Sequence, residues 1–183
     1  MKKLTLSVLL ALSTISTSTL ANVYIQGDIG SSKITPDGFN GGTATDFRIS
    51  IGYDFGNYRL AADYTKFGTV SESDQVYGVN VDYSAKIQSI GFSAIYDFHN
   101  STALTPYLGV RVGYTKADVS AAANRSYYQV SADSSTTSAG FGALAGIQYK
   151  FTDHIDLNLG AEYNRLASDT SQFGGKLGLR FNF

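Results

Sequence analysis

The chain has 183 residues, with no cysteine, no tryptophan and two prolines, but 19 glycines, 13 tyrosines and 11 phenylalanines. Its 14 Lys and Arg residues against 15 Asp and Glu give a formal net charge of −1, which excludes the strongly basic balance of a nucleic-acid-binding protein. The lack of cysteine excludes a disulfide framework and most thiol chemistry.

Residues 1–21 have the three-part pattern of a secretory signal peptide. A basic start at Lys2 and Lys3 is followed by an apolar stretch over 4–12, and the segment ends at Ala21 with the small residue that signal peptidase prefers. The apolar stretch is too short for a membrane-spanning helix. We therefore expect cleavage after Ala21 and an exported protein.

Residues 22–183 are expected to form one domain, in which large apolar residues alternate with polar or small ones. In the stretch 47–55, odd positions are Phe, Ile, Ile, Tyr and Phe, while even positions are Arg, Ser, Gly and Asp. This period of two is typical of β-strands, in a soluble sandwich or in a barrel. The aliphatic faces end in aromatic residues, and the other faces carry Gly, Ser and pairable charge. That order indicates a lipid-facing band around a narrow interior, and hence a transmembrane barrel.

A repeated aromatic mark gives the number of strands. Tyr53–Phe55, Tyr96–Phe98 and Tyr149–Phe151 each precede a polar turn, and Phe181–Phe183 ends the chain. Four strands running to one membrane interface require eight in all, and the sheet must close because lipid offers no hydrogen bonds. The sequence predicts an all-β, eight-stranded antiparallel up-and-down barrel. The expected strands cover residues 22–33, 45–55, 58–68, 84–98, 106–117, 137–151, 155–165 and 173–183.

Long polar connections alternate with short turns. The long ones are expected at 34–44, 69–83, 118–136 and 166–172. In outer-membrane barrels the short turns face the periplasm and the long loops face outward. The sequence therefore predicts a bacterial outer-membrane protein with four extracellular loops and both termini in the periplasm.

Two parts of the chain resemble the opacity family. Residues 140–149 and 157–164 are similar to the last hairpin of neisserial opacity proteins and of the shorter surface protein A barrels, and 93–98 with 106–111 is similar to their central turn. The resemblance covers most of the domain and is strongest from Gly91 onward. It implies a surface barrel of porin-like class. The loops are shorter here than the hypervariable loops of opacity adhesins, so it implies no receptor preference.

Charged residues of both signs occupy positions expected to face the barrel interior. An eight-stranded barrel is only just wide enough to be filled by its own side chains. The pattern therefore favours a plug of ion pairs over a conducting pore. The residues assigned to this lumen charge network are Asp28, Arg48, Arg59, Asp63, Arg111, Glu162, Lys176 and Arg180, with Asp54 and Asp97 on the same faces.

No enzyme, metal site or cofactor is expected. Acyl transfer or hydrolysis on outer-leaflet lipid needs a base, usually histidine, at the outer rim, whereas His99 and His154 both fall in expected periplasmic turns. Glu72, Asp74 and Asp82 are loosely spaced and lack the pattern of a calcium loop, so a solvated acidic loop is the simpler interpretation.

The third outer loop contains the best binding candidates. Tyr127, Tyr128 and Arg125 are residue types that dominate binding interfaces, although the tyrosines could instead extend strands and pack on a neighbour. We expect the loops to serve adhesion or host-factor binding, through a host-surface or serum protein. The alternatives are a narrow porin-like channel and a structural stabiliser of the outer membrane.

Other partners follow from the expected location. Outer-membrane lipid and lipopolysaccharide would surround the barrel, and no nucleic-acid partner is expected. Leu179, Phe181 and Phe183 at the C-terminus are similar to the signal that the barrel-assembly machinery reads during biogenesis.

Overall fold

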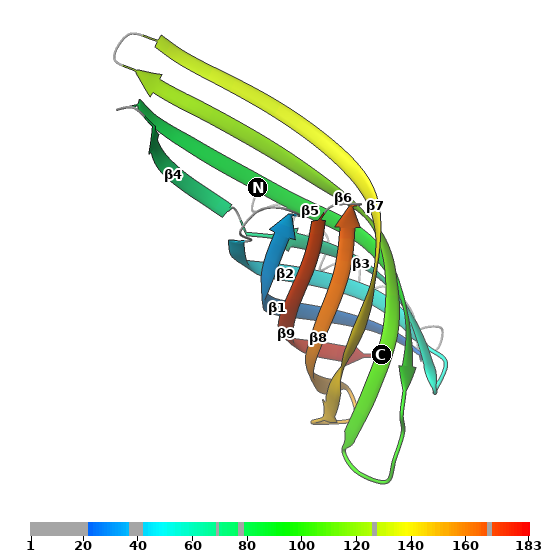
Figure 1. Ribbon diagram of the computed structural model, residues 1–183. Helices are drawn as coiled ribbons and strands as arrows, with labels where there is room; N and C mark the ends of the chain where they lie inside the picture. The colour runs from blue at the N-terminus through cyan, green and yellow to red at the C-terminus, as the bar shows by residue number, and fades with distance from the viewer. Residues whose placement is uncertain (1–21, 37–41, 69, 77–78, 126–127, 168–169) are drawn as a thin grey trace, which may run out of the picture.

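The computed structural model describes residues 22–36, 42–68, 70–76, 79–125, 128–167 and 170–183 (Figure 1). The expected signal peptide, 1–21, lies outside these residues. Within the described ranges the chain forms nine strands: β1 (Val23–Pro36), β2 (Gly42–Asp54), β3 (Tyr58–Phe67), β4 (Val70–Val76), β5 (Val79–Asp97), β6 (Leu104–Arg125), β7 (Tyr128–Lys150), β8 (Ile155–Ala167) and β9 (Thr170–Asn182).

Eight of these strands close into a barrel, which confirms the predicted fold class. The sheet runs β3-β2-β1-β9-β8-β7-β6-β5-β4, and an additional antiparallel pairing of β3 with β5 closes it. β4 follows β3 in the chain and pairs with the first part of β5, from Val70↔Ala85 to Val76↔Val79. It therefore adds to one end of the barrel without adding a strand to the barrel wall.

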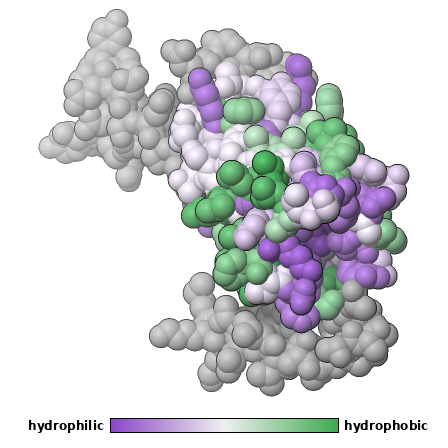
Figure 2. Space-filling model, turned by 90° about the horizontal axis from the view of Figure 1, so that it is seen from below, coloured by the Kyte–Doolittle hydropathy of each residue, from purple (hydrophilic) through white to green (hydrophobic). Residues whose placement is uncertain are grey.

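The burial pattern is the reverse of that in a soluble protein. On β2, Phe47, Ile49 and Ile51 are 53%, 48% and 55% exposed, whereas Arg48 and Ser50 between them are buried. Hydrophobic side chains flank a hydrophilic area when the molecule is seen from below (Figure 2). An apolar outer band around a polar interior is the arrangement of a barrel in lipid. Among the described residues, no helix is long and apolar enough to cross a membrane.

The short turns lie at one end of the barrel, together with the first and last described residues, Asn22 and Phe183. Between β2 and β3, Gly56 adopts a positive φ of 92° and its N–H donates to the Asp54 carboxylate at 2.8 Å. Such a φ favours glycine because it has no Cβ. The Asp54 N–H donates to the carbonyl of Asn22 at 2.7 Å, and the Phe183 N–H to that of Val23 at 3.1 Å.

At the other end of the barrel, paired strands form a long extension where two loops were expected. Residues 69–83 and 118–136 were expected as loops, but most of the described residues there are paired strand. β5 and β6 stay in register out to Asn80↔Asn124, and β6 and β7 to Arg125↔Tyr128. Most residues of 118–136 are small or polar and give little alternation, whereas 79–87 does alternate, so the sequence could have indicated the longer β5.

We call this extension the outer arm: β4 with residues 79–87, 117–125 and 128–136. In Figure 1 it reaches well beyond the other strands. The two other expected loops, 34–44 and 166–172, are also shorter than predicted, because β1 and β2 extend to Pro36 and Gly42, and β8 and β9 to Ala167 and Thr170.

Candidate functional site

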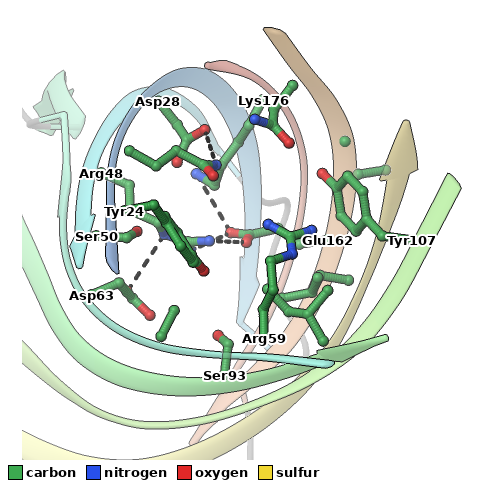
Figure 3. A pocket seen from close by; sticks show the side chains of 17 residues that line it. Tyr24, Asp28, Arg48, Ser50, Arg59, Asp63, Ser93, Tyr107, Glu162 and Lys176 are labelled. Carbon is green, nitrogen blue, oxygen red and sulfur yellow. Dashed lines mark hydrogen bonds and ion pairs between the residues drawn. The ribbon is translucent and has the colours of Figure 1, made fainter. Parts of the chain in front are cut away.

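A chain of alternating charges crosses the barrel interior. Asp63 on β3 accepts two hydrogen bonds from Arg111 on β6, at 2.9 and 2.6 Å, and lies 3.5 Å from Nε of Arg48 on β2. The Arg48 Nη1 lies 2.7 Å from Oε2 of Glu162 on β8 (Figure 3). Asp63 and Arg111, and likewise Glu162 and Arg48, thus meet across the interior from strands that are not neighbours in the sheet.

The chain of charges continues to Lys176 on β9. Its ammonium lies 3.4 Å from Oε1 of Glu162 and also pairs with Asp46 on β2. Gln172 donates to Glu162 at 3.1 Å and to Ser32 at 2.8 Å, and Ser32 donates to Asp46. Polar neighbours therefore satisfy the remaining lone pairs, which a buried ion pair needs to be tolerated.

A second group of contacts lies nearer the short turns. Arg59 on β3 donates to Asp97 on β5 through Nε and Nη2, at 2.5 and 2.7 Å. Its guanidinium carbon lies 5.8 Å from the ring centroid of Tyr24 and 5.3 Å from that of Tyr107. Two-point Arg–carboxylate contacts and cation–π contacts both stabilise a guanidinium away from water.

Arg180 on β9 closes this end of the network. It donates to Asp54 at 2.6 Å and to Gln148 at 3.0 Å, and its Nε lies 3.8 Å from Asp156. Its guanidinium carbon lies 4.2 Å from the Tyr24 ring centroid. The same tyrosine therefore contacts two arginines.

A small cavity of about 60 Å³ remains among these side chains, with Tyr24, Asp28, Tyr107 and Asn158 in its lining. Asp28 accepts a hydrogen bond from Gln26 at 2.8 Å. The side-chain amide of Asn158 is buried, and within the described part of the chain it has no hydrogen-bond partner. The space is enough for about two waters.

All the residues assigned to the lumen charge network are buried within the barrel. Among the described residues, every one except Asp28 takes part in an ion pair with N···O of 4.0 Å or less. The assignment missed Asp46 and Asp156, which are equally buried. Asp46 lies two residues before Arg48 on the same face of β2, so the alternation itself could have identified it.

The loop candidates cannot be placed as side chains. Tyr127 lies outside the described residues. The backbones of Arg125 and Tyr128 are paired at the tip of the outer arm, but the described structure does not extend to their side chains. Leu179 and Phe181 on β9, and Phe183 just after it, are exposed on the apolar side of the barrel, and their recognition by the barrel-assembly machinery stays a prediction.

The two histidines lie in short turns, His99 after β5 and His154 before β8, at the end opposite the outer arm. Among the described residues, no group of three or more His, Cys, Asp or Glu side chains could hold a metal ion.

The charges of the interior nearly balance. Of the described charged residues that are fully buried, five are basic and six are acidic. Such a network ties strands together across the lumen, and removal of a member such as Asp97 or Lys176 leaves Arg59 or Asp46 without its ion-pair partner in a low-dielectric interior. The described charged side chains of the interior are therefore largely paired with one another across the barrel.

Comparison with known proteins gives a consistent assignment. Residues 51–183 match the family described as "Opacity family porin protein". An uncharacterised protein of Haemophilus influenzae is 46% identical over the full length of both chains. Protein opa of the same organism is 32% identical, and the alignment covers 73% of this chain and all of that protein.

Solved structures agree on the fold. Neisserial surface protein A superposes with a TM-score of 0.65 at 28% identity, covering 88% of this chain and 97% of that one. The attachment invasion locus protein of Yersinia pestis gives 0.62 at 18% identity, covering 89% and 99%, and shows the fold alone. The chain belongs to the opacity family of outer-membrane β-barrel proteins.

Proposed function

We propose that the barrel displays the outer arm at the cell surface for adhesion or host-factor binding. The arm would face outward, and the short turns and both termini would face the periplasm. The barrel would act as a fixed base, and binding would depend on a few side chains near the arm's tip.

The observation that carries this proposal is the length of paired backbone beyond the barrel wall. On β6, pairing with β5 and β7 continues from Lys116 to Asn124, and with β7 to Arg125. At about 3.4 Å per residue, this part of the strand is roughly 30 Å long. A barrel that only stabilised the membrane would need no such extension.

The filled interior supports the same function. Ion pairs from five strands occupy the lumen, and the cavity between these side chains is about 60 Å³. Arg111 ties β6, near the base of the arm, to Asp63 on β3 and to Ser89 on β5. A binding surface on a preorganised support loses less conformational entropy when it meets its partner.

The adhesion experiment compares two forms of the barrel in a bacterium that does not itself adhere. The trimmed form lacks residues 71–84 and 118–135, each replaced by an Asn-Gly turn. Because Val70↔Ala85 and Ala117↔Thr136 are cross-strand partners, tight turns there keep the register. Both forms must first show the heat-dependent gel shift of a folded barrel.

We expect the full-length form to confer binding to epithelial monolayers or immobilised serum proteins, and the trimmed form to lose it. Equal binding by both forms, or none by either, would contradict the proposal. The attachment invasion locus protein was solved with the heparin analogue sucrose octasulfate, which makes that compound a useful soluble competitor. Alanine at Arg125, Tyr127 and Tyr128 then tests whether the tip residues carry the binding.

A further inference from the structure

Three lysines gather on the outer face of the barrel at the root of the arm. Lys66 on β3 is the register partner of Gln88 on β5, which is in turn the partner of Lys116 on β6. Lys86 lies two residues further along β5, on the same face, opposite Asp118. All three lysines are exposed. We call Lys66, Lys86 and Lys116 the lysine cluster.

The cluster has a fixed polar centre and a net positive charge. The Tyr64 hydroxyl donates to the side-chain oxygen of Gln88 at 3.1 Å, which holds the glutamine between the lysines. Lys116 lies 3.1 Å from the carboxylate of Asp118 and remains half exposed. Three lysines against one aspartate leave an excess of two positive charges on adjoining strands.

The height of the cluster on the barrel corresponds to the lipid headgroups. On β6, the outward residues from Leu104 to Tyr114 are apolar or aromatic, and Lys116 is the next outward residue. The ten residue steps between Leu104 and Tyr114, on a strand tilted by about 40°, span roughly 25 Å, the height of the apolar band of an outer-membrane barrel. Lys116 therefore lies just beyond the hydrocarbon.

An apolar groove of about 420 Å³ runs directly below the cluster on the lipid-facing side of β5, β6 and β7. Its upper edge is formed by Ile90, Tyr114 and Ala139, which are mutual register neighbours one step below the cluster. Ala139 is small, while Phe92, Val112 and Phe141 around it are large, and this difference produces the hollow.

We propose that the lysine cluster and this groove together bind one lipopolysaccharide molecule of the outer leaflet, through its lipid A phosphates and one acyl chain. Lysines bind phosphate as point charges. The outer lysines of the cluster are two strand spacings apart, about 10 Å, which suits a lipid with more than one phosphate. The assignment to the outer leaflet rests on the proposed outward direction of the arm.

The test measures lipid binding to the purified, folded, full-length barrel in detergent by native mass spectrometry. The probes are diphosphorylated lipid A, dephosphorylated lipid A and phosphatidylglycerol. We expect the diphosphorylated form to bind best. Lys66→Gln/Lys116→Gln should weaken its binding about tenfold or more. The matched control, Lys33→Gln/Lys150→Gln, removes the same charge from sites outside the cluster and should change binding less than twofold.

The groove is tested separately, without any change of charge. Ala139→Phe fills the hollow and should weaken binding of diphosphorylated lipid A at least fivefold. Ala143→Phe, two outward positions along β7 and outside the groove lining, should leave it unchanged. The proposal would be overturned if Ala139→Phe and Ala143→Phe weakened lipid binding equally, or if the two double lysine variants did. It would also be overturned if the barrel showed no preference for phosphorylated lipid A.

This experiment and the adhesion experiment fail independently. The trimmed barrel keeps all three lysines and the groove, so loss of adhesion says nothing against the lipid site. If labelling of the arm showed that it faces the periplasm, the cluster would lie at the inner leaflet. That result would overturn the lipopolysaccharide assignment even if phospholipid bound there.

Discussion

Arg48 and Glu162 are 114 residues apart in the sequence and meet across the lumen, with Nη1 of the arginine 2.7 Å from Oε2 of the glutamate. Their strands, β2 and β8, are separated in the sheet by β1 and β9. The contact is therefore a tie through the interior, additional to the hydrogen bonds of the barrel wall. Glu162 also lies 3.4 Å from Lys176, so one carboxylate serves two cations.

Loss of this carboxylate should destabilise the barrel strongly. Glu162→Gln keeps the shape of the side chain but leaves Arg48 and Lys176 short of an anion in a buried site. Breaking a buried pair costs about 3–5 kcal/mol, so we expect a reduction of that order in the free energy of unfolding. Urea titration of the folded barrel, followed by its gel shift, measures it.

The matched control for this substitution is Asp118→Asn, which breaks an exposed ion pair with Lys116. Exposed pairs are screened by solvent and contribute little, so its unfolding midpoint should stay close to that of the native barrel. If the two variants lost stability equally, the interior network would have no special role in the fold.

The filled interior predicts that the barrel does not conduct. In planar bilayers, the native protein should give no discrete current steps, because ion-paired side chains cross the lumen and the cavity between them is about 60 Å³. A large porin incorporated into the same bilayers provides the positive control. Reproducible steps from the native barrel would instead support the narrow-channel alternative.

Asn158 offers a substitution that should stabilise the protein. Its amide is buried without a hydrogen-bond partner in the described structure and lines the lumen cavity. Asn158→Leu removes a buried polar group that has no protein partner in the described structure and fills space, so the unfolding midpoint should rise or stay unchanged. Asn164→Leu on the same face of β8 should lower it, since Asn164 donates to Gln172 at 2.5 Å. Destabilisation by both to the same extent would contradict this.

Much of the barrel could be predicted from alternation alone, because lipid outside and a narrow lumen inside impose opposite demands on successive residues. The rule placed Arg48, Asp63 and Glu162 in the interior. It could not pair them, because partners such as Arg48 and Glu162 lie on strands that meet only in the closed barrel. It was not applied before residue 84 on β5, although 79–87 alternates, and it gives little signal in the small and polar residues of 118–136.

The turn between β7 and β8 should give the barrel a weak dependence on acidic pH. The hydrogen bond from Lys150 lowers the pKa of Asp153 below its ordinary value of 3.8. A lowered pKa contributes stability above the unfolded-state value, which is lost as the pH falls through the folded-state value. Asp153→Asn should therefore lower the unfolding midpoint slightly near neutral pH, and by less as the pH falls below 3.8. A constant shift across that range would exclude this cause.

The direction of the outer arm can be read by labelling, because the chain contains no cysteine. Ser131→Cys places one thiol in the arm, and Ser101→Cys places one in the exposed turn after β5. With the arm outward, a membrane-impermeant maleimide should label Ser131→Cys on intact cells, and Ser101→Cys only after the outer membrane is opened. The reverse pattern would place the arm in the periplasm. Adhesion through the arm would then be impossible, since no partner outside the cell could reach it.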